Sequence, residues 1–343
     1  MAAQAPMRRP TRYSLLLALA LVAALAVALF LRAKAPPEVA RLLPECDAIV
    51  YANLKPLRSA THFDKTTIAR SPEFQQFIDA TGIVPERDLD AVAFALHRME
   101  DPSGPNGPVA YSEVFEGRFD GARLERYLSS IAMAKESYAG REIFVIPVGD
   151  AGDAKHPSQQ RLLRVTQLGY DTIAASNMPT TEQIHAMLDR HRAAASPFAG
   201  SSLLSARYGD VPVLSSAWAI GHIGLPFSES GYITAFGLRL PLAEDTTLVA
   251  SLRYLGSIKL RIEEISPSDA DAAQSAKALS TVLNLFRSIQ KIQTEAHPDR
   301  PANSAMLQAI DSLKITESGD RTVLTASLPL ELLRELMRPE KQP

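Results

Sequence analysis

The residues in this 343-residue chain that come nearest to a catalytic motif are Ser288-Ile289-Gln290-Lys291. A lysine one helical turn after a serine can take the hydroxyl proton and so activate the oxygen as a nucleophile. In the penicillin-recognising enzymes this pair stands at a helix start, and SDN and KTG motifs follow further along the chain. Here the pair falls near the end of a predicted long helix, and neither motif follows. We interpret Ser288 and Lys291 as residues of a solvated helix face.

Histidines next to acidic residues are the second source of candidate chemistry. His185 and Asp189 lie one turn apart on a predicted helix and could share a proton or a metal ion. His191, six residues after His185, points about 240° away around the same helix. His297-Pro298-Asp299 lies in a polar loop, and the sequence places no two further ligands beside it. We therefore predict no metal site and no bound cofactor.

The remaining polar or aromatic candidates favour packing or surface positions. Glu263 and Glu264 are consecutive near a strand end, so they point to opposite faces and cannot act as a carboxylate pair. Trp218, the single tryptophan, lies in a largely apolar strand, where we expect it to pack rather than to stack on a ligand. His62 and His222 are interpreted as packing or surface histidines.

Five motifs are absent from the sequence: GxGxxG, GxxxxGK[ST], HExxH, CxxC and GxSxG. Each absence removes the local geometry that the corresponding nucleotide, metal, redox or nucleophilic chemistry requires. Cys46 is the single cysteine, so no intrachain disulfide forms, and we interpret it as a buried or half-buried apolar residue. The sequence assigns a catalytic role to no residue.

The first structural element that the sequence predicts is an apolar segment near the N-terminus. Residues 14–31 carry no charge and follow three arginines, Arg8, Arg9 and Arg12. As a helix they would be about 27 Å long, close to the roughly 30 Å of a bilayer's hydrocarbon core. We predict a cytoplasmic tail at 1–13 and a transmembrane helix at 14–32.

A cleaved secretory signal is the alternative interpretation of this segment. Ala33-Lys34-Ala35 fits a cleavage site loosely, but Pro36 would follow the cut directly and the apolar run is longer than usual. Both interpretations imply export. The basic residues on the two sides of the span do not decide its orientation. Since the tail before it is short, we expect a single-pass protein of the bacterial inner membrane with its large domain periplasmic or extracellular.

Small residues within the span suggest a homodimer. Ala20, Ala24 and Ala28 recur at every fourth position, the spacing that lets two transmembrane helices approach closely. Because alanine fills much of the segment, chance spacing is the competing explanation.

Composition and charge restrict the classes of partner. A hydrophobic content of 46% is that of a globular protein with a core, not of a disordered chain. Residues 1–35 contain five basic and no acidic side chains, which leaves 31 basic against 38 acidic residues and a net charge of about −7 beyond them. A nucleic-acid partner would need a basic face instead. We therefore expect that the protein does not bind nucleic acid. Its expected partners are the membrane and another protein or an envelope component.

Periodicity and turn residues predict an α+β fold of antiparallel sheets with helices packed on one face. We expect a linker at 33–44, a first half at 45–195 and a second half at 196–343, or one continuous domain. The predicted strands are 47–54, 90–97, 109–119, 143–148, 162–167, 171–175, 211–220, 232–240, 246–254, 258–263, 313–316 and 322–328. Predicted helices start near residues 71, 120, 181, 266, 302 and 329.

Short motifs give the chain a resemblance to a known group. Asp47 to Tyr51 follow a proline-containing linker, and Gly117 to Asp120 open a helix. Tyr138 to Gly140 precede the strand Ile143 to Ile146, and a leucine-rich helix ends the chain. In these features it resembles uncharacterised bacterial single-pass membrane proteins with an exported domain of unknown function. The resemblance implies a location and a fold class but no activity.

Three functions stay open at this point. The leading hypothesis is a non-enzymatic, membrane-tethered envelope protein that binds another protein or an envelope component. The alternatives are an envelope hydrolase whose catalytic residues are dispersed along the sequence, and a carrier with an apolar pocket between its sheet and a long helix.

Overall fold

The computed structural model describes residues 35–65, 70–148, 161–193, 200–222, 246–254, 257–296 and 304–330, together with 17, 21–22, 25 and the backbone of 232–235 and 238–241. Of the predicted span 14–31, it thus describes Leu17, Leu21, Val22 and Leu25, which are helical and more than half exposed. The other span residues, including Ala20, Ala24 and Ala28, lie outside the described residues. Among the described residues, no helix combines the length and the apolar character that crossing a membrane requires.

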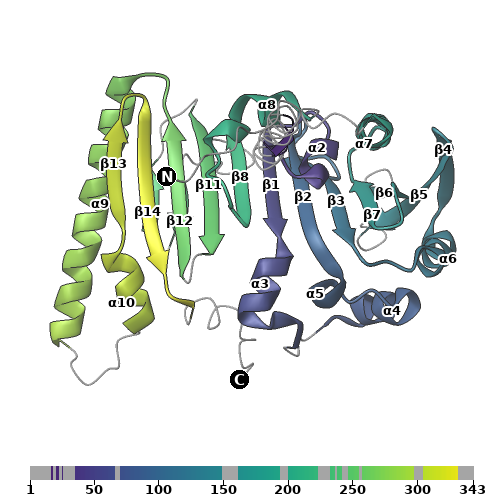
Figure 1. The fold of residues 1–343 in the computed structure, drawn as a ribbon, viewed down its shortest axis with the longest axis horizontal. Coiled ribbons are helices and arrows are strands. Elements are labelled where there is room, and N and C mark those ends of the chain that lie inside the picture. Colours follow the sequence, from purple (N-terminus) through teal and green to yellow (C-terminus); the bar gives the residue numbers. More distant parts are fainter. Residues whose placement is uncertain are drawn as a thin grey trace, which may run out of the picture.

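The chain forms an α+β structure built on one antiparallel sheet of twelve strands, which confirms the predicted class (Figure 1). The strand order is β13-β14-β12-β11-β8-β1-β2-β3-β7-β6-β5-β4. The first seven strands along the chain are β1 (Ala48–Asn53), β2 (Leu89–Arg98), β3 (Val109–Gly117), β4 (Ala134–Tyr138), β5 (Arg141–Val148), β6 (Arg161–Gln167) and β7 (Thr172–Ser176). The others are β8 (Ala217–His222), β11 (Thr247–Tyr254), β12 (Ile258–Ile265), β13 (Lys314–Ser318) and β14 (Arg321–Leu328).

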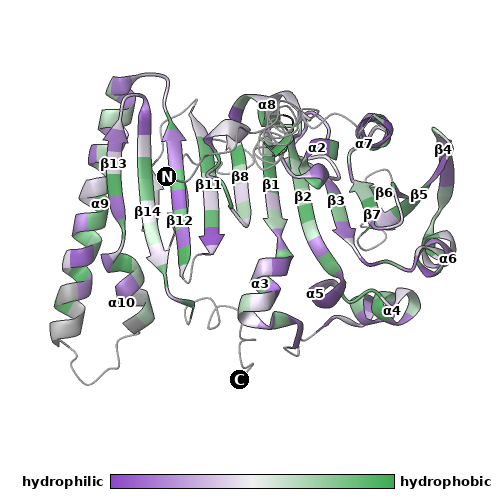
Figure 2. Cartoon of the chain, viewed as in Figure 1, coloured by the Kyte–Doolittle hydropathy of each residue, from purple (hydrophilic) through white to green (hydrophobic). Residues whose placement is uncertain are grey.

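Strand β1 lies near the middle of this sheet and pairs with β8 on one side and with β2 on the other. Ile49 stands opposite Ala95 of β2 on one side and opposite Ile220 of β8 on the other. Hydrogen bonding is thus continuous across the predicted boundary near residue 195. The division into two halves at that point stays a prediction. Figure 2 shows apolar residues concentrated on β1 and β8, whereas β4 and β12 are more hydrophilic.

Helices cover both faces of the sheet, so the prediction that they pack on one face is wrong. One face, here the α7 face, is covered by α2 (Glu38–Leu42), α7 (Glu182–Arg192) and α8 (Ser202–Arg207). The other, the α9 face, is covered by α4 (Pro72–Thr81), α6 (Gly121–Ile131), α9 (Asp269–Ala296) and α10 (Ser304–Asp311). Two covered faces are needed because strands such as β5 and β12 carry apolar side chains in both directions.

Local sequence signals explain where the helices of the α9 face begin and end. The Ser71 hydroxyl accepts a hydrogen bond from the Phe74 amide at the start of α4, and Pro72 follows at the first helical position. Gly82 ends α4 with a left-handed φ of 75°. The Asp120 carboxylate accepts from the Arg123 amide at the start of α6. The two helix starts agree with those predicted from the sequence near residues 71 and 120.

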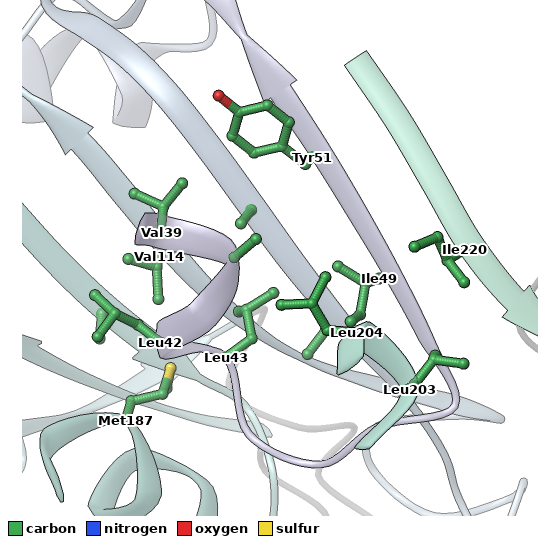
Figure 3. Packing of buried hydrophobic residues seen from close by; sticks show 14 of the residues in the cluster. Val39, Leu42, Leu43, Ile49, Tyr51, Val114, Met187, Leu203, Leu204 and Ile220 are labelled. Carbon is green, nitrogen blue, oxygen red and sulfur yellow. The ribbon is translucent and has the colours of Figure 1, made fainter. Parts of the chain in front are cut away.

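The segment predicted as a linker at 33–44 includes a core element. Helix α2 buries Val39 and Leu42, and the next residue, Leu43, is fully buried (Figure 3). These side chains pack between α7, which contributes Met187, and the strand β1. The apolar spacing within the short stretch after Pro37 provides the physical reason, since it presents one continuous face to the sheet.

The strand predicted at 211–220 begins later than expected. Helix α8 and the 3₁₀ turn η3 (Tyr208–Asp210) precede it, and β8 starts at Ala217. Pro212 lacks an amide hydrogen for a strand ladder, and Leu214 adopts a left-handed φ of 65°. Pairing starts only when the Ser216 amide donates to the Leu252 carbonyl. The strand predicted at 232–240 is instead a separate two-stranded ladder of β9 (Tyr232–Ala235) and β10 (Leu238–Pro241).

Candidate ligand-binding site

The α9 face is hollowed beside α6 into a cavity of about 340 Å³, here called the α6 pocket. A cavity of this size lies at the lower end of the range for small-molecule sites. Its floor is the sheet and its walls are α4 and α6. The lining residues are Phe77, Ile83, Pro85, Leu89, Glu113, Phe115, Phe119, Leu124, Tyr127, Leu128, Ile131, Ile146, Leu163, Val165, Ile173 and Ala175.

Helix α6 forms the wall because its apolar residues recur on one side. Leu124 and Leu128 are buried against the sheet, and Ile131 at the rim is 38% exposed. Tyr127 meets Phe77 of α4 edge to face, with 5.5 Å between ring centroids. The two helices therefore hold each other and leave space between their aromatic rings and the strands below.

Strand β3 supplies the one charged side chain among the described lining residues. Glu113 stands opposite Phe94 of β2 and Ala175 of β7, both uncharged. Within the part of the chain that the structure describes, no hydrogen bond or ion pair joins the Glu113 carboxyl group to another residue. Burial raises the pKa of Glu113 to about 7. The group is thus an acid held in apolar surroundings, close to its titration midpoint at neutral pH.

A second apolar pocket of about 180 Å³ lies on the same face, near the strand ends beside α3 (Leu54–Thr61). We call it the α3 pocket. Leu252 and Tyr254 of β11 stand at its rim, 36% and 39% exposed. The lining residues are Ala52, Asn53, Leu54, Pro56, Leu57, Ala60, Ser216, Ala217, Leu252, Arg253, Tyr254, Ile258, Leu328 and Leu330.

The α7 face holds a histidine and a serine in contact, but they are sealed from solvent. The His97 ring nitrogen Nε2 lies 3.0 Å from the Ser112 hydroxyl, which lies 2.9 Å from the hydroxyl of Ser176. Ser112 is fully buried and His97 is 6% exposed. Burial lowers the pKa of His97 to about 4, so the ring is neutral. A substrate cannot reach this serine, and the arrangement serves the packing of β2, β3 and β7.

Sequence reasoning missed both Glu113 and the His97–Ser112 pair. His97 ends one strand and Ser112 lies in the next, fifteen residues later, so only the pairing register brings them together. For Glu113 a signal was present. It is an acid between two apolar neighbours two residues away on the same strand face, Tyr111 and Phe115.

The structure places the predicted helix candidates away from both pockets. Ser288 is exposed on α9 and donates its hydroxyl hydrogen to the Asn284 carbonyl. His185 stacks on Tyr138, with ring centroids 3.8 Å apart, and the Tyr138 hydroxyl donates to Asp189. The side chain of Lys291 and the segment His297–Asp299 lie outside the described residues.

The remaining candidates from the sequence are tied into packing or lie at the surface. Trp218 is 3% exposed and stacks on Tyr51 at 5.4 Å. His62 and His222 are exposed. Burial, together with the neighbouring carboxylates Glu45 and Asp47, raises the pKa of Cys46 to about 12, so its sulfur stays protonated.

Glu263 and Glu264 point in opposite directions from β12, as their spacing predicted. Both are 2% exposed. Glu263 accepts from Arg261 and Arg321 on the α7 face, whereas Glu264 accepts from the Ser275 hydroxyl of α9. Across the described ranges, no three His, Cys, Asp or Glu side chains gather as ligands for a metal ion.

Comparison with known proteins gives a loose structural likeness. No protein-family model matches the chain, and no curated protein sequence matches it. Crystal form III of TP0453 superposes with a TM-score of 0.47 at 12% identity, over 88% of this chain and 98% of that one. Forms I and IV superpose with TM-scores of 0.42 at 12% identity, over 89% and 87% of this chain and 98% and 96% of theirs.

Proposed function

We propose that the protein is a non-enzymatic module of the bacterial envelope that binds an apolar ligand in the α6 pocket. The observation that carries this proposal is the cavity of about 340 Å³ whose described lining is aliphatic and aromatic, apart from Glu113. Transfer of alkyl surface from water into such a lining is favourable by about 0.8 kcal/mol for each buried CH₂ group. The function is therefore capture of a hydrocarbon chain.

The shape and the apolar lining of the α6 pocket support a carrier rather than a hydrolase or a protein-binding module. A hydrolase needs its nucleophile at a surface that substrate reaches, whereas Ser112 beside His97 is fully buried. A partner-binding patch is flat, whereas the α9 face is hollowed in two places. Both hollows are apolar, which suits a hydrocarbon ligand better than a polar peptide.

We also propose that residues 14–31 tether this module to the inner membrane, with the large domain outside the cytoplasm. The supporting observations are the eighteen uncharged positions and the basic residues before them. Fractionation of cells that express a tagged full-length chain is expected to place it in the membrane pellet, with the domain open to external protease in spheroplasts. Recovery in the cytosolic supernatant would contradict the tether.

Ligand binding is tested by photolabelling, because the labelled peptide identifies the site. The full-length chain in nanodiscs of zwitterionic lipid is irradiated with an alkyl diazirine and digested. We expect label on peptides of β3, β6 and α6. Leu163→Trp, which fills the α6 pocket, is expected to abolish that label.

Leu57→Trp serves as the matched control, because it fills the α3 pocket and leaves the α6 pocket open. Circular dichroism checks that both variants fold. Equal labelling of the β3 peptide in the wild type and in Leu163→Trp would refute the proposed function. Label lost only in Leu57→Trp would move the site to the α3 pocket.

A further inference from the structure

We infer that the α6 pocket selects an amphiphile with one alkyl chain and a protonated amine, whose nitrogen pairs with the carboxylate of Glu113. This inference rests on the proposed function and adds to it the chemistry of the ligand's polar end. Three observations carry it: the apolar lining, the position of Glu113 within that lining, and the absence of a partner for its carboxyl group within the described residues.

An unpaired carboxyl group in an apolar cavity is costly when it is ionised. Folding removes water from the group, and no residue of the described lining returns a positive charge. A ligand that brings a cation restores the missing interaction at the moment of binding. The pocket thus has apolar surface for a chain and one point at which a positive charge is stabilised.

The alternatives differ in what they offer Glu113. A fatty acid brings a second carboxylate, which repels the first and requires one of the two to be protonated. A fatty alcohol donates a neutral hydrogen bond. An ammonium group donates a charge-assisted hydrogen bond, which is about twice as strong. Of three heads on the same chain, the amine should therefore bind most tightly.

Few other titratable groups stand near Glu113. Of the described lining residues, Tyr127 of α6 is the other one that titrates, and α4, α5 (Pro85–Asp88), β2, β5, β6 and β7 present uncharged side chains there. Tyr111 lies two residues before Glu113 on β3. Burial, and after it the charge of Glu113, raises the pKa of Tyr111. Arg161 acts on Tyr111 in the opposite direction and donates to the Pro105 carbonyl. None of these groups neutralises Glu113.

The test compares octylamine, octanol and octanoic acid as competitors of the photolabel in the full-length chain at pH 8. We expect octylamine to remove label from the β3 peptide at about one tenth of the octanol concentration, a difference of about 1.4 kcal/mol, because its hydrogen bond to Glu113 is charge-assisted. Octanoic acid should be the weakest. At pH 5, where Glu113 is protonated, the gap between amine and alcohol should close.

Two variants separate the inference from the proposed function. Glu113→Gln should bring octylamine and octanol to the same potency, because the variant side chain carries no negative charge. Glu116→Gln is the control, because it removes one negative charge from the same strand on the α7 face, near Tyr51. An amine preference that survives Glu113→Gln, or octylamine no stronger than octanol in the wild type, overturns the inference alone. Failure of all three competitors overturns the proposed function as well.

Discussion

Ser112 and Glu113 are neighbours on β3 and lie on opposite faces of the sheet. The Ser112 hydroxyl is enclosed between His97 and Ser176 on the α7 face, whereas Glu113 lines the α6 pocket on the α9 face. One residue step therefore separates a buried hydroxyl that is hydrogen-bonded from a half-buried carboxyl group that has no partner among the described residues. The first stabilises the fold, and the second leaves a group available to a ligand.

The Glu113→Gln substitution is expected to stabilise the free protein at alkaline pH. Because the folded pKa of Glu113, about 7, lies above its ordinary value of 4.5, the folded state holds its proton more tightly than the unfolded state. Stability falls as pH rises through this window, by up to about 3 kcal/mol above pH 7. Urea unfolding at pH 8 should show a gain of about 2 kcal/mol for the variant, with no such gain at pH 4.5.

Glu125→Gln, on the exposed side of α6, controls for the loss of one negative charge. It should leave the unfolding midpoint at pH 8 unchanged. A Glu113→Gln protein that is no more stable than the wild type at pH 8 would show that the carboxyl group is well solvated.

His97 is expected to make the fold sensitive to acid. Its folded pKa of about 4 lies below the ordinary value of 6.5, so the unfolded state binds a proton first. Stability should fall as pH drops from 6.5 towards 4, and this residue contributes about 3 kcal/mol to the loss. The change in unfolding free energy between pH 7 and pH 4.5 should be smaller in His97→Gln than in the wild type. Equal changes in the two proteins would contradict the assignment.

Arg321 holds a buried acid at the junction of β12, β14 and η3. Its Nη1 atom donates to Glu263 at 2.7 Å and to Asp210 at 2.9 Å. Removing it leaves Glu263 with Arg261 as a partner, so Arg321→Ala should cost about 2 kcal/mol in unfolding free energy, less than a fully buried pair because Arg321 is partly exposed. Arg192→Ala, which breaks an exposed contact with Asp189, should have no measurable effect.

Helix α2 is expected to be part of the folding unit rather than a tether. Leu42 is 2% exposed within the core, so Leu42→Ala should lower the unfolding free energy by about 3 kcal/mol. Val213→Ala is the control, since that side chain is 53% exposed in a loop. Thermal unfolding of both variants checks this. A Leu42→Ala protein as stable as the control would mean that α2 is dispensable.

The sequence by itself determined the elements that depend on nearest neighbours. Ser71, Pro72 and Gly82 set the ends of α4, and Asp120 sets the start of α6, because a cap acts on the backbone within three residues. Alternation along β12 likewise predicted that Glu263 and Glu264 part to opposite faces. Periods of two and of 3.6 residues are local properties, so they can be read along the chain.

Only the tertiary structure decided which faces meet. That helices cover both sides of the sheet, that α2 enters the core, and that β1 pairs with β8 all depend on contacts between distant residues. The apolar environment of Glu113 also depends on distant residues, since it is formed by side chains of α4, α6, β6 and β7. An acid on a strand is ordinary until the fold removes its water, and desolvation is a property of the assembled neighbourhood rather than of the residue.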